Sequence, residues 1–404
     1  MIRLKEGVLQ STDAFLADAI GIAEYYGFTS LDTIARKPVQ GNATKNTEAM
    51  AKAENDISFA RRDERALPAA ARKLLARVNP RETMLAWRVV GNAGTCPSVS
   101  LELHILGTSS TIAEALLIIV ANAIAQQAGA EERVVLINNI GSSESSGRYI
   151  RDVGLYLRKH IESISPTLRP RAAIDPLGTL VQLIERGHPA VPRAPQAMEY
   201  LTEEERSRFW EILEYLESAG LPYELNPHIL GSRDCWSHSL FEISQIDPAT
   251  HMRIPIALGG RYDPLMSRFA RAPRSAAMVS ISCEAPNSAK KSKAPPYEGK
   301  IAPMIYLTHL GTLARQRALT VLENLRQADI HVHHSLWHDR ITEQMERATA
   351  FGTPYILILG HKEVTEGTIV VREVATNSQA TVPIEDLTSY LKRHRTITRP
   401  KALA

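Results

Sequence analysis

A short stretch in the second half of the chain, Leu258–Asp263, brings together residue types that bind charged ligands. It reads Leu-Gly-Gly-Arg-Tyr-Asp and follows an apolar run that begins at Ile254. Paired glycines after a strand allow the backbone to turn tightly and allow a ligand to approach it. Arg261, Tyr262 and Asp263 then offer a cation, an amphipathic ring and an anion. The stretch is therefore a candidate binding site, and the alternative is a strand-ending turn with solvated side chains.

Composition narrows the class of protein. The 404 residues predict two or three domains, and 44% hydrophobic with 23% charged residues is ordinary for a soluble globular protein. A net charge of +3 excludes a strong overall field for nucleic acid but leaves room for a local basic patch. The three cysteines form no Cys-x-x-Cys pair, which argues against a disulfide framework or structural zinc, so no metal site is expected.

The chain also carries no pattern for secretion or for membrane insertion. The N-terminal residues lack the apolar segment of a signal peptide, and no apolar run reaches the roughly 20 residues of a membrane span. We therefore expect a cytoplasmic protein.

Periodicity in the first half predicts a mixture of helices and paired strands around a long polar loop over residues 38–63. The predicted helices cover 13–26, 68–78, 108–128 and 143–161. The predicted strands cover 28–34, 83–90, 98–106 and 134–138. The strands at 83–90 and 98–106 are expected to form an antiparallel hairpin.

The middle of the chain begins with an insertion at about 162–200 that is rich in proline. Because proline breaks long helices, this segment is expected to wrap a surface. Thr202-Glu203-Glu204-Glu205 fits a capping box, so a helix is predicted from 203 to 219. Strands are then predicted at 223–230, 240–245, 254–258 and 276–282.

Residues 286–300 have the composition of a linker, and beyond them the pattern changes to alternating strands and helices. The predicted strands cover 304–308, 330–333, 355–359 and 369–373, and the predicted helices cover 313–328, 341–351 and 384–393. The expected domains are a core over 1–285, the linker, and an α/β domain over 301–404.

The motifs occur in the order of one known family. Leu258–Asp263 resembles the second histidine-specific motif of histidyl-tRNA synthetases, and Tyr200–Asn226 resembles the segment leading into the first. Ile20–Ile34 resembles motif 1 of class II synthetases, and Ala350–Arg372 follows the pattern of the class II anticodon-binding domain. The resemblance spans nearly the whole chain. It implies an α+β class II aminoacyl-tRNA synthetase-like core, with an antiparallel sheet flanked by helices, plus a C-terminal α/β anticodon-binding-type domain. It also implies a homodimer.

The resemblance assigns roles to particular residues. Those implied to bind substrate are Gly259, Gly260, Arg261, Tyr262, Asp263, Asp234 and Glu242. Arg393 and Arg395, in the basic C-terminal tail, are candidates for contact with tRNA. If ligase activity is retained, Arg88 and Arg233 would supply catalytic cations, and ATP and Mg²⁺ would be needed; otherwise no cofactor is expected.

Several positions depart from the family pattern, and four elements have lost charge together. In the first histidine motif Gly231 occupies the arginine position, and Cys235 and Trp236 replace two tyrosines. The motif 2 loop lacks its charged run, and Ala285 replaces the arginine of motif 3. Leu67–Ala70 stands where the family has a segment with a carboxylate. Because a charge lost from a phosphate clamp costs orders of magnitude in rate, the sequence predicts loss of ordinary aminoacylation.

Three functions remain open at this point. The favoured one is a degenerate paralogue that binds tRNA or regulates a partner enzyme. The first alternative is a divergent, active histidine–tRNA ligase that uses Arg88, Arg233 and Arg261 in shifted roles. The second is a sensor of an amino acid or a nucleotide. A cluster of four histidines between His331 and His338 is interpreted as a polar strand exit in preference to a metal site.

Overall fold

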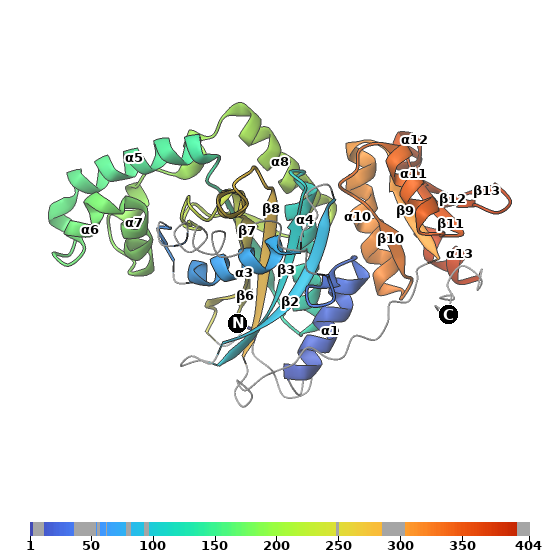
Figure 1. Ribbon diagram of the computed structural model, residues 1–404, viewed down its shortest axis with the longest axis horizontal. Helices are drawn as coiled ribbons and strands as arrows, with labels where there is room; N and C mark the ends of the chain where they lie inside the picture. Colours follow the sequence, from blue (N-terminus) through green and yellow to red (C-terminus); the bar gives the residue numbers. More distant parts are fainter. Residues whose placement is uncertain are drawn as a thin grey trace, which may run out of the picture.

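The computed structural model describes residues 1–2, 12–35, 54, 57–61, 63–77, 82–92, 97–247, 250–284 and 304–393. Most of the loop expected at 38–63, the linker expected at 286–300 and the candidate Arg395 lie outside these residues. The described residues form two sheets with their own helices, drawn on the left and right of Figure 1.

The larger sheet has eight strands in the order β1-β2-β3-β8-β7-β6-β4-β5. Their bounds are β1 Thr29–Ser30, β2 Met84–Asn92, β3 Ser98–Leu106, β4 Arg133–Asn139, β5 Tyr223–Leu225, β6 Ser237–Ile246, β7 Arg253–Arg261 and β8 Ala276–Glu284. The six central strands pair antiparallel, and β1 and β5 add parallel edges. The hairpin prediction is confirmed, but the strands expected at 28–34 and 223–230 are much shorter because loops take over after Ser30 and Leu225.

Helices cover both faces of this sheet. On one face lie α1 (Thr12–Tyr25), α4 (Ile112–Gln127) and α8 (Glu203–Ser218), and α4 is buried on nearly all sides. The predicted capping box of α8 is present, with Thr202 and Glu205 bonded reciprocally. On the other face lie α3 (Leu67–Leu75), the 3₁₀ turn η1 (Asp63–Ala66) and α9 (Asp263–Ala270).

The proline-rich insertion contains short helices that the sequence analysis did not predict. Helix α5 (Ser143–Lys159) packs on α6 (Arg169–Ile174) and α7 (Pro176–Glu185) to make the extension at the far left of Figure 1. Proline is accepted at the start of a helix because its missing N–H would be unpaired there. Asp175 caps α7 by accepting from the Gly178 N–H at 2.9 Å. Three short 3₁₀ turns complete the segment: η2 Ile161–Ser163, η3 Val191–Arg193 and η4 Ala197–Tyr200.

The smaller sheet has five strands in the order β10-β9-β11-β12-β13. Its strands are β9 Ile305–His309, β10 Val332–His334, β11 Tyr355–Leu359, β12 Thr368–Glu373 and β13 Gln379–Pro383. Its helices are α10 Thr312–Gln327, α11 Ile341–Ala350, α12 His361–Glu366 and α13 Leu387–Arg393, with the 3₁₀ turn η5 at Ile384–Asp386. The sequence predictions missed α12 and β13, which are short and weakly periodic.

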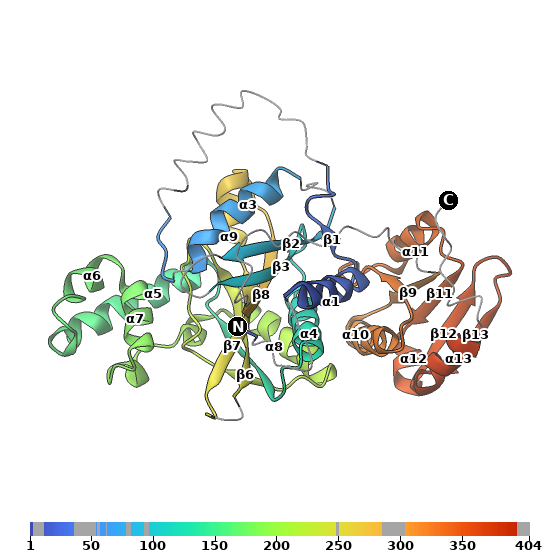
Figure 2. The same cartoon turned by 90° about the horizontal axis from the view of Figure 1, so that it is seen from below.

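The two sheet units meet through α1 and α8, and Figure 2 shows α1 between them. The Tyr25 hydroxyl lies 3.1 and 3.0 Å from the carbonyl oxygens of Leu322 and Ile330, and the Tyr26 hydroxyl donates to Glu323. The Thr320 hydroxyl donates to the Ser218 carbonyl at 3.0 Å. None of the helices in the described part of the chain has the length and apolar character needed to cross a membrane.

Candidate functional site

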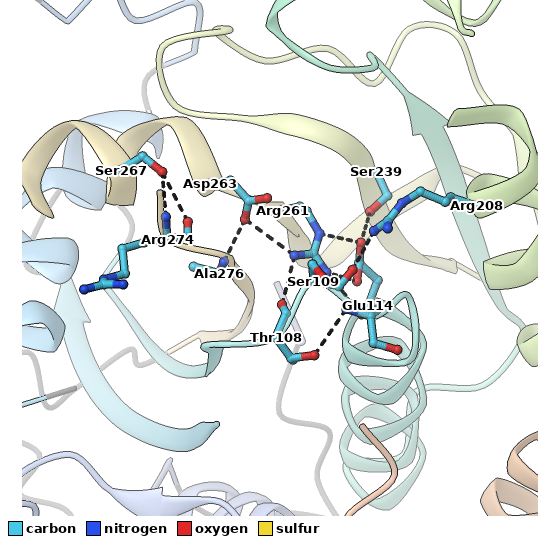
Figure 3. Close-up of polar contacts among 11 residues, drawn as sticks. Thr108, Ser109, Glu114, Arg208, Ser239, Arg261, Asp263, Ser267, Arg274 and Ala276 are labelled. Atoms are coloured by element: carbon cyan, nitrogen blue, oxygen red, sulfur yellow. Dashed lines mark hydrogen bonds and ion pairs between the residues drawn. The ribbon is translucent and has the colours of Figure 1, made fainter. Parts of the chain in front are cut away.

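Arg261 lies under the sheet in a buried ion pair with Glu114. Side chains alternate between the two faces of a strand, and the alternation of β7 directs Arg261 to the face that α4 covers. Its Nε and Nη2 donate to the two Glu114 carboxylate oxygens at 2.8 and 2.5 Å, and Nη1 and Nη2 reach the carbonyls of Thr108 and Ser110 at 3.2 Å (Figure 3). Burial alone would lower the pKa of the guanidinium, but the Glu114 carboxylate outweighs burial and raises this pKa above its ordinary value. This arginine is therefore bonded within the protein, on the face of the sheet that α4 covers.

Gly259 and Gly260 lie within β7, so the turn that the alternative interpretation placed at these glycines is absent. A Cβ at Gly259 would stand 2.4 Å from the Met278 carbonyl oxygen and 2.5 Å from the Phe241 ring. A Cβ at Gly260 would stand 2.6 Å from the Ser239 carbonyl oxygen. The glycines let neighbouring strands and a phenyl ring pack closely. This packing explains both glycines without a bound ligand.

Asp263 opens α9 and closes the same network. It accepts from the Ala276 N–H at 2.7 Å and lies 3.5 Å from Arg261 Nη1. Burial raises the pKa of its carboxyl to about 6, although the Arg261 cation opposes the rise. The aspartate therefore ties α9 to β8 and to the Arg261–Glu114 pair.

On the opposite face of the sheet, four polar side chains form a chain of contacts. Arg88 on β2 pairs with Glu102 on β3 at 2.5 Å, His104 lies 3.3 Å from Glu102, and its Nδ1 lies 3.1 Å from the Tyr262 hydroxyl. Burial would raise the pKa of Glu102, but the bonds from His104 and Arg88 lower it to about 2. Burial lowers the pKa of His104 and raises that of Tyr262. Arg88 thus neutralises a carboxylate of its own sheet.

The loop before β6 is closed by Glu64, which is fully buried. Its carboxylate accepts from the Ser232 N–H at 2.8 Å and from the Trp236 indole at 3.2 Å, and also from the backbone of Ala60 and Arg61. A Cβ at Gly231 would lie 2.5 Å from the Trp236 ring and 3.0 Å from Glu64. The position where the family pattern has an arginine is therefore occupied by the tryptophan and by the Glu64 latch.

Apolar side chains cover this end of the face. Trp236, Tyr262 and Met278 belong to one buried cluster with Leu67 and Leu74 of α3. Because protein interiors are close-packed, a cluster of this kind leaves little room for a substrate among its members. Cys235 is buried in the same cluster, and burial raises the pKa of its thiol.

The other predicted substrate residues are spread around this end. Asp234 pairs with Arg268 at 3.0 Å and accepts from the Ser58 N–H at 3.0 Å. Glu242 lies on β6 and accepts from the Ser244 hydroxyl at 2.5 Å. Arg233 is exposed and makes no hydrogen bond or ion pair with another residue that the structure describes.

The carboxylates near this face suit an ATP–Mg²⁺ complex poorly. Magnesium is usually held by one or two carboxylates together with substrate phosphates. Here Glu102 is paired with Arg88, and Asp234 is paired with Arg268. Among the described residues no group of three or more His, Cys, Asp or Glu side chains could hold a metal ion, and this includes the His331–His338 segment.

In the smaller unit, Arg393 is exposed at the end of α13 and donates to the Ser389 carbonyl at 3.3 Å. Sequence reasoning missed Glu64, Glu102, His104 and Glu114, the partners that determine what the predicted residues do. Glu102 and His104 share one face of a strand that had been predicted, so their pairing could have been found from alternation. Glu64 gave no signal, because it lies in a weakly periodic segment.

The chain is similar in sequence to several known proteins. A family profile described as "Anticodon binding domain" matches residues 305–394. The chain is 26% identical over 298 residues to a histidine–tRNA ligase of Thermosynechococcus vestitus, covering 74% of this chain and 69% of that protein. It is also 26% identical over 294 residues to histidine–tRNA ligase 1 of Shouchella clausii, covering 73% and 69%. Among solved structures, apo histidyl-tRNA synthetase of S. aureus superposes with a TM-score of 0.49 at 17% identity, covering 96% of this chain and 98% of the other.

Proposed function

We propose that this chain, a member of the histidyl-tRNA synthetase family with a class II core and a C-terminal anticodon-binding domain, is non-catalytic and binds tRNA. In this proposal it does not join histidine to ATP. The C-terminal unit keeps the part of the fold that contacts RNA.

One observation carries the loss of catalysis: three arginines near the sheet are paired with carboxylates of the protein. Arg261 is bonded to Glu114, Arg88 to Glu102 and Arg268 to Asp234. Adenylate formation needs cations directed at the α-phosphate, where negative charge develops. A guanidinium already neutralised by a buried carboxylate contributes little to that task. The latch of Glu64 and Trp236 at the Gly231 position supports the same conclusion.

The tRNA-binding half of the proposal rests on the match of residues 305–394 to the anticodon-binding profile. Filter binding of the full chain with total tRNA tests it. We expect an affinity that falls as salt concentration rises, because lysine and arginine contacts to phosphate release counterions. A double variant, Arg393→Ala with Arg395→Ala, should weaken binding uniformly across tRNAs, whereas Arg317→Ala on α10 serves as an exposed control. Failure to bind tRNA even at low salt would refute the proposal. The proposed homodimer, with α1 as motif 1, is tested by light scattering.

A second candidate is a divergent ligase in which Arg233 provides the missing cation. The observation in its favour is that Arg233 is exposed and without a hydrogen-bond or ion-pair partner among the described residues. Arg233 lies in the turn before β6, two residues after the Gly231 position, so the strand alternation that would have returned its side chain to the same face does not apply. This ligase would need ATP and Mg²⁺, and it predicts that Arg233→Ala abolishes histidine-dependent adenylate formation.

A further inference from the structure

A cavity of about 700 Å³ lies between the two sheet units, apart from the face of the larger sheet discussed above. One wall comes from α1 and the start of β2, and the other comes from β9, β10 and α11. Figure 2 shows α1 next to the smaller unit at this place. Cavities of roughly 300–1,000 Å³ hold small molecules, so the size is that of a ligand site.

The wall from the smaller unit presents an aromatic platform. The Phe351 ring stacks on the His333 imidazole with centroids 4.3 Å apart and planes 23° from parallel, and Tyr306 lies 6.1 Å from Phe351. Phe351 is nevertheless 56% exposed, so much of its ring is free to contact a ligand. Where the two walls meet, the Tyr25 ring of α1 lies 5.7 Å from the His331 ring, which directly precedes β10 in the smaller unit. Flat rings stack well on platforms of this kind.

A cation stands one helical turn from the platform. Arg347 lies four residues before Phe351 at the end of α11, and residues at this spacing are neighbours on one helix face. Its guanidinium makes no hydrogen bond or ion pair with another residue of the described part of the chain, and the residue lines the cavity. Arg77 on the facing wall is held by the carbonyls of Ile34 and Lys73 at 3.2 and 3.1 Å, and its nearest carboxylate, Asp32, is 4.0 Å away. Arg347 is therefore available to an anion, whereas Arg77 is held by these two carbonyls and by the ion pair with Asp32.

Two buried polar atoms at this wall also lack partners. The His334 Nε2 bonds to the Tyr26 carbonyl at 3.1 Å, which leaves Nδ1 as an acceptor with no donor. The Trp337 indole N–H is a donor with no acceptor in the described residues. Because buried polar groups are nearly always hydrogen-bonded, such atoms mark a place where an ordered water or a polar ligand edge completes the site.

We propose that this cavity binds a nucleotide, with its base stacked on Phe351 and its phosphate held by Arg347. The aromatic surface and the unpaired guanidinium, one turn apart, match the two ends of a nucleotide. The same chemistry has two sources, a free mononucleotide or an unpaired nucleotide of an RNA strand. Because the cavity is walled by both units, the bound nucleotide links α1 to the C-terminal unit. The site is separate from Arg393 at the end of α13, and the proposal holds whether or not the chain binds tRNA.

The test is isothermal titration of the full chain with AMP, with adenosine and with a short single-stranded oligoadenylate. We expect saturable binding of AMP and at least tenfold weaker binding of adenosine, which lacks the phosphate. Phe351→Ala should weaken binding by roughly tenfold to a hundredfold, as loss of a base–aromatic stack does, and Arg347→Gln by about tenfold. The matched controls are Leu313→Ala, at a position 54% exposed, and Arg317→Gln, both on α10 and outside the cavity wall.

The binding results distinguish a free mononucleotide from an RNA strand as the ligand. Binding of the oligonucleotide alone, lost in Phe351→Ala and Arg347→Gln, supports the proposal and assigns the site to RNA. Binding of AMP with the same losses assigns it to a free nucleotide. The proposal is overturned if neither probe binds at millimolar concentration, or if both variants bind as the controls do. Thermal unfolding of each variant verifies that these partly exposed substitutions leave the fold intact.

Discussion

Replacing Arg261 with methionine should destabilise the larger sheet unit by roughly 3–5 kcal/mol, because it leaves the Glu114 carboxylate buried without a cation. The two side chains are only 1% and 2% exposed, so water cannot replace the lost partner. Methionine fills a similar volume, so the expected loss comes from charge and hydrogen bonds and owes little to a cavity.

A double-mutant cycle measures the coupling energy between Arg261 and Glu114. Glu114→Gln leaves the cation, but Arg261 keeps the carbonyls of Thr108 and Ser110 and lies 3.5 Å from Asp263, so we expect a smaller loss of about 2–3 kcal/mol. The double variant should lose about 3–4 kcal/mol, which is well short of the sum of the single losses. The resulting coupling of roughly 2–4 kcal/mol would measure the buried pair.

The assay is urea unfolding followed by tryptophan fluorescence, because Trp87 and Trp236 report on the larger sheet unit. The control is Arg253→Met. Arg253 donates two hydrogen bonds to Glu224 at 2.8 and 2.7 Å, but the pair is 44% and 51% exposed. Exposed pairs contribute less than about 1 kcal/mol, so this variant should unfold nearly as the parent does. If Arg261→Met matched the control, or if the cycle were additive, Arg261 would not be a structural residue and a ligand role would regain support.

Two further predictions concern the effect of the strand glycines and of His334 on the free energy of unfolding. Gly259→Ala should cost about 2–3 kcal/mol, because its Cβ would collide with the Met278 carbonyl, while Gly91→Ala, with nothing within 4 Å, should change the unfolding free energy by less than about 0.5 kcal/mol in the same assay. Burial lowers the pKa of His334 to about 4 from 6.5, so the folded chain binds fewer protons than the unfolded chain between these values and stability falls as pH drops through that window. Roughly 2 kcal/mol should be lost by about pH 5 relative to about pH 7.5, and His334→Gln should lose less; equal pH dependence in parent and variant would contradict this.

The sequence was sufficient for the elements that periodicity and capping specify. The Thr202 capping box and the hairpin of β2 and β3 are set by neighbouring residues, and the structure contains both. The helix α7 could have been predicted from its Asp175-Pro176 start, where an N-cap precedes a proline at the first helical position. The number of prolines in the segment suggests broken helices, whereas the position of Pro176 directly after an N-cap indicates the start of one.

The environment of the site residues could not be read in the same way, because their partners are distant in the chain. Arg261 meets Glu114 across 147 residues, and Glu64 meets Trp236 across 172. A motif specifies which residue types are present, whereas the pairing of strands decides which face each side chain joins. From the sequence, Arg261 is a candidate ligand for a charged substrate. In the fold it is bonded to the Glu114 carboxylate of α4.

The most direct test of the central claim is histidine-dependent ATP–pyrophosphate exchange by the purified full chain, run beside the S. aureus histidyl-tRNA synthetase as a positive control. We expect a rate no higher than that of the histidine-free blank, because Arg261, Arg88 and Arg268 are neutralised by carboxylates of the protein. Exchange that depends on histidine and comes within about a hundredfold of the control enzyme would contradict it, since removing even one stabilising group typically costs a factor of that size.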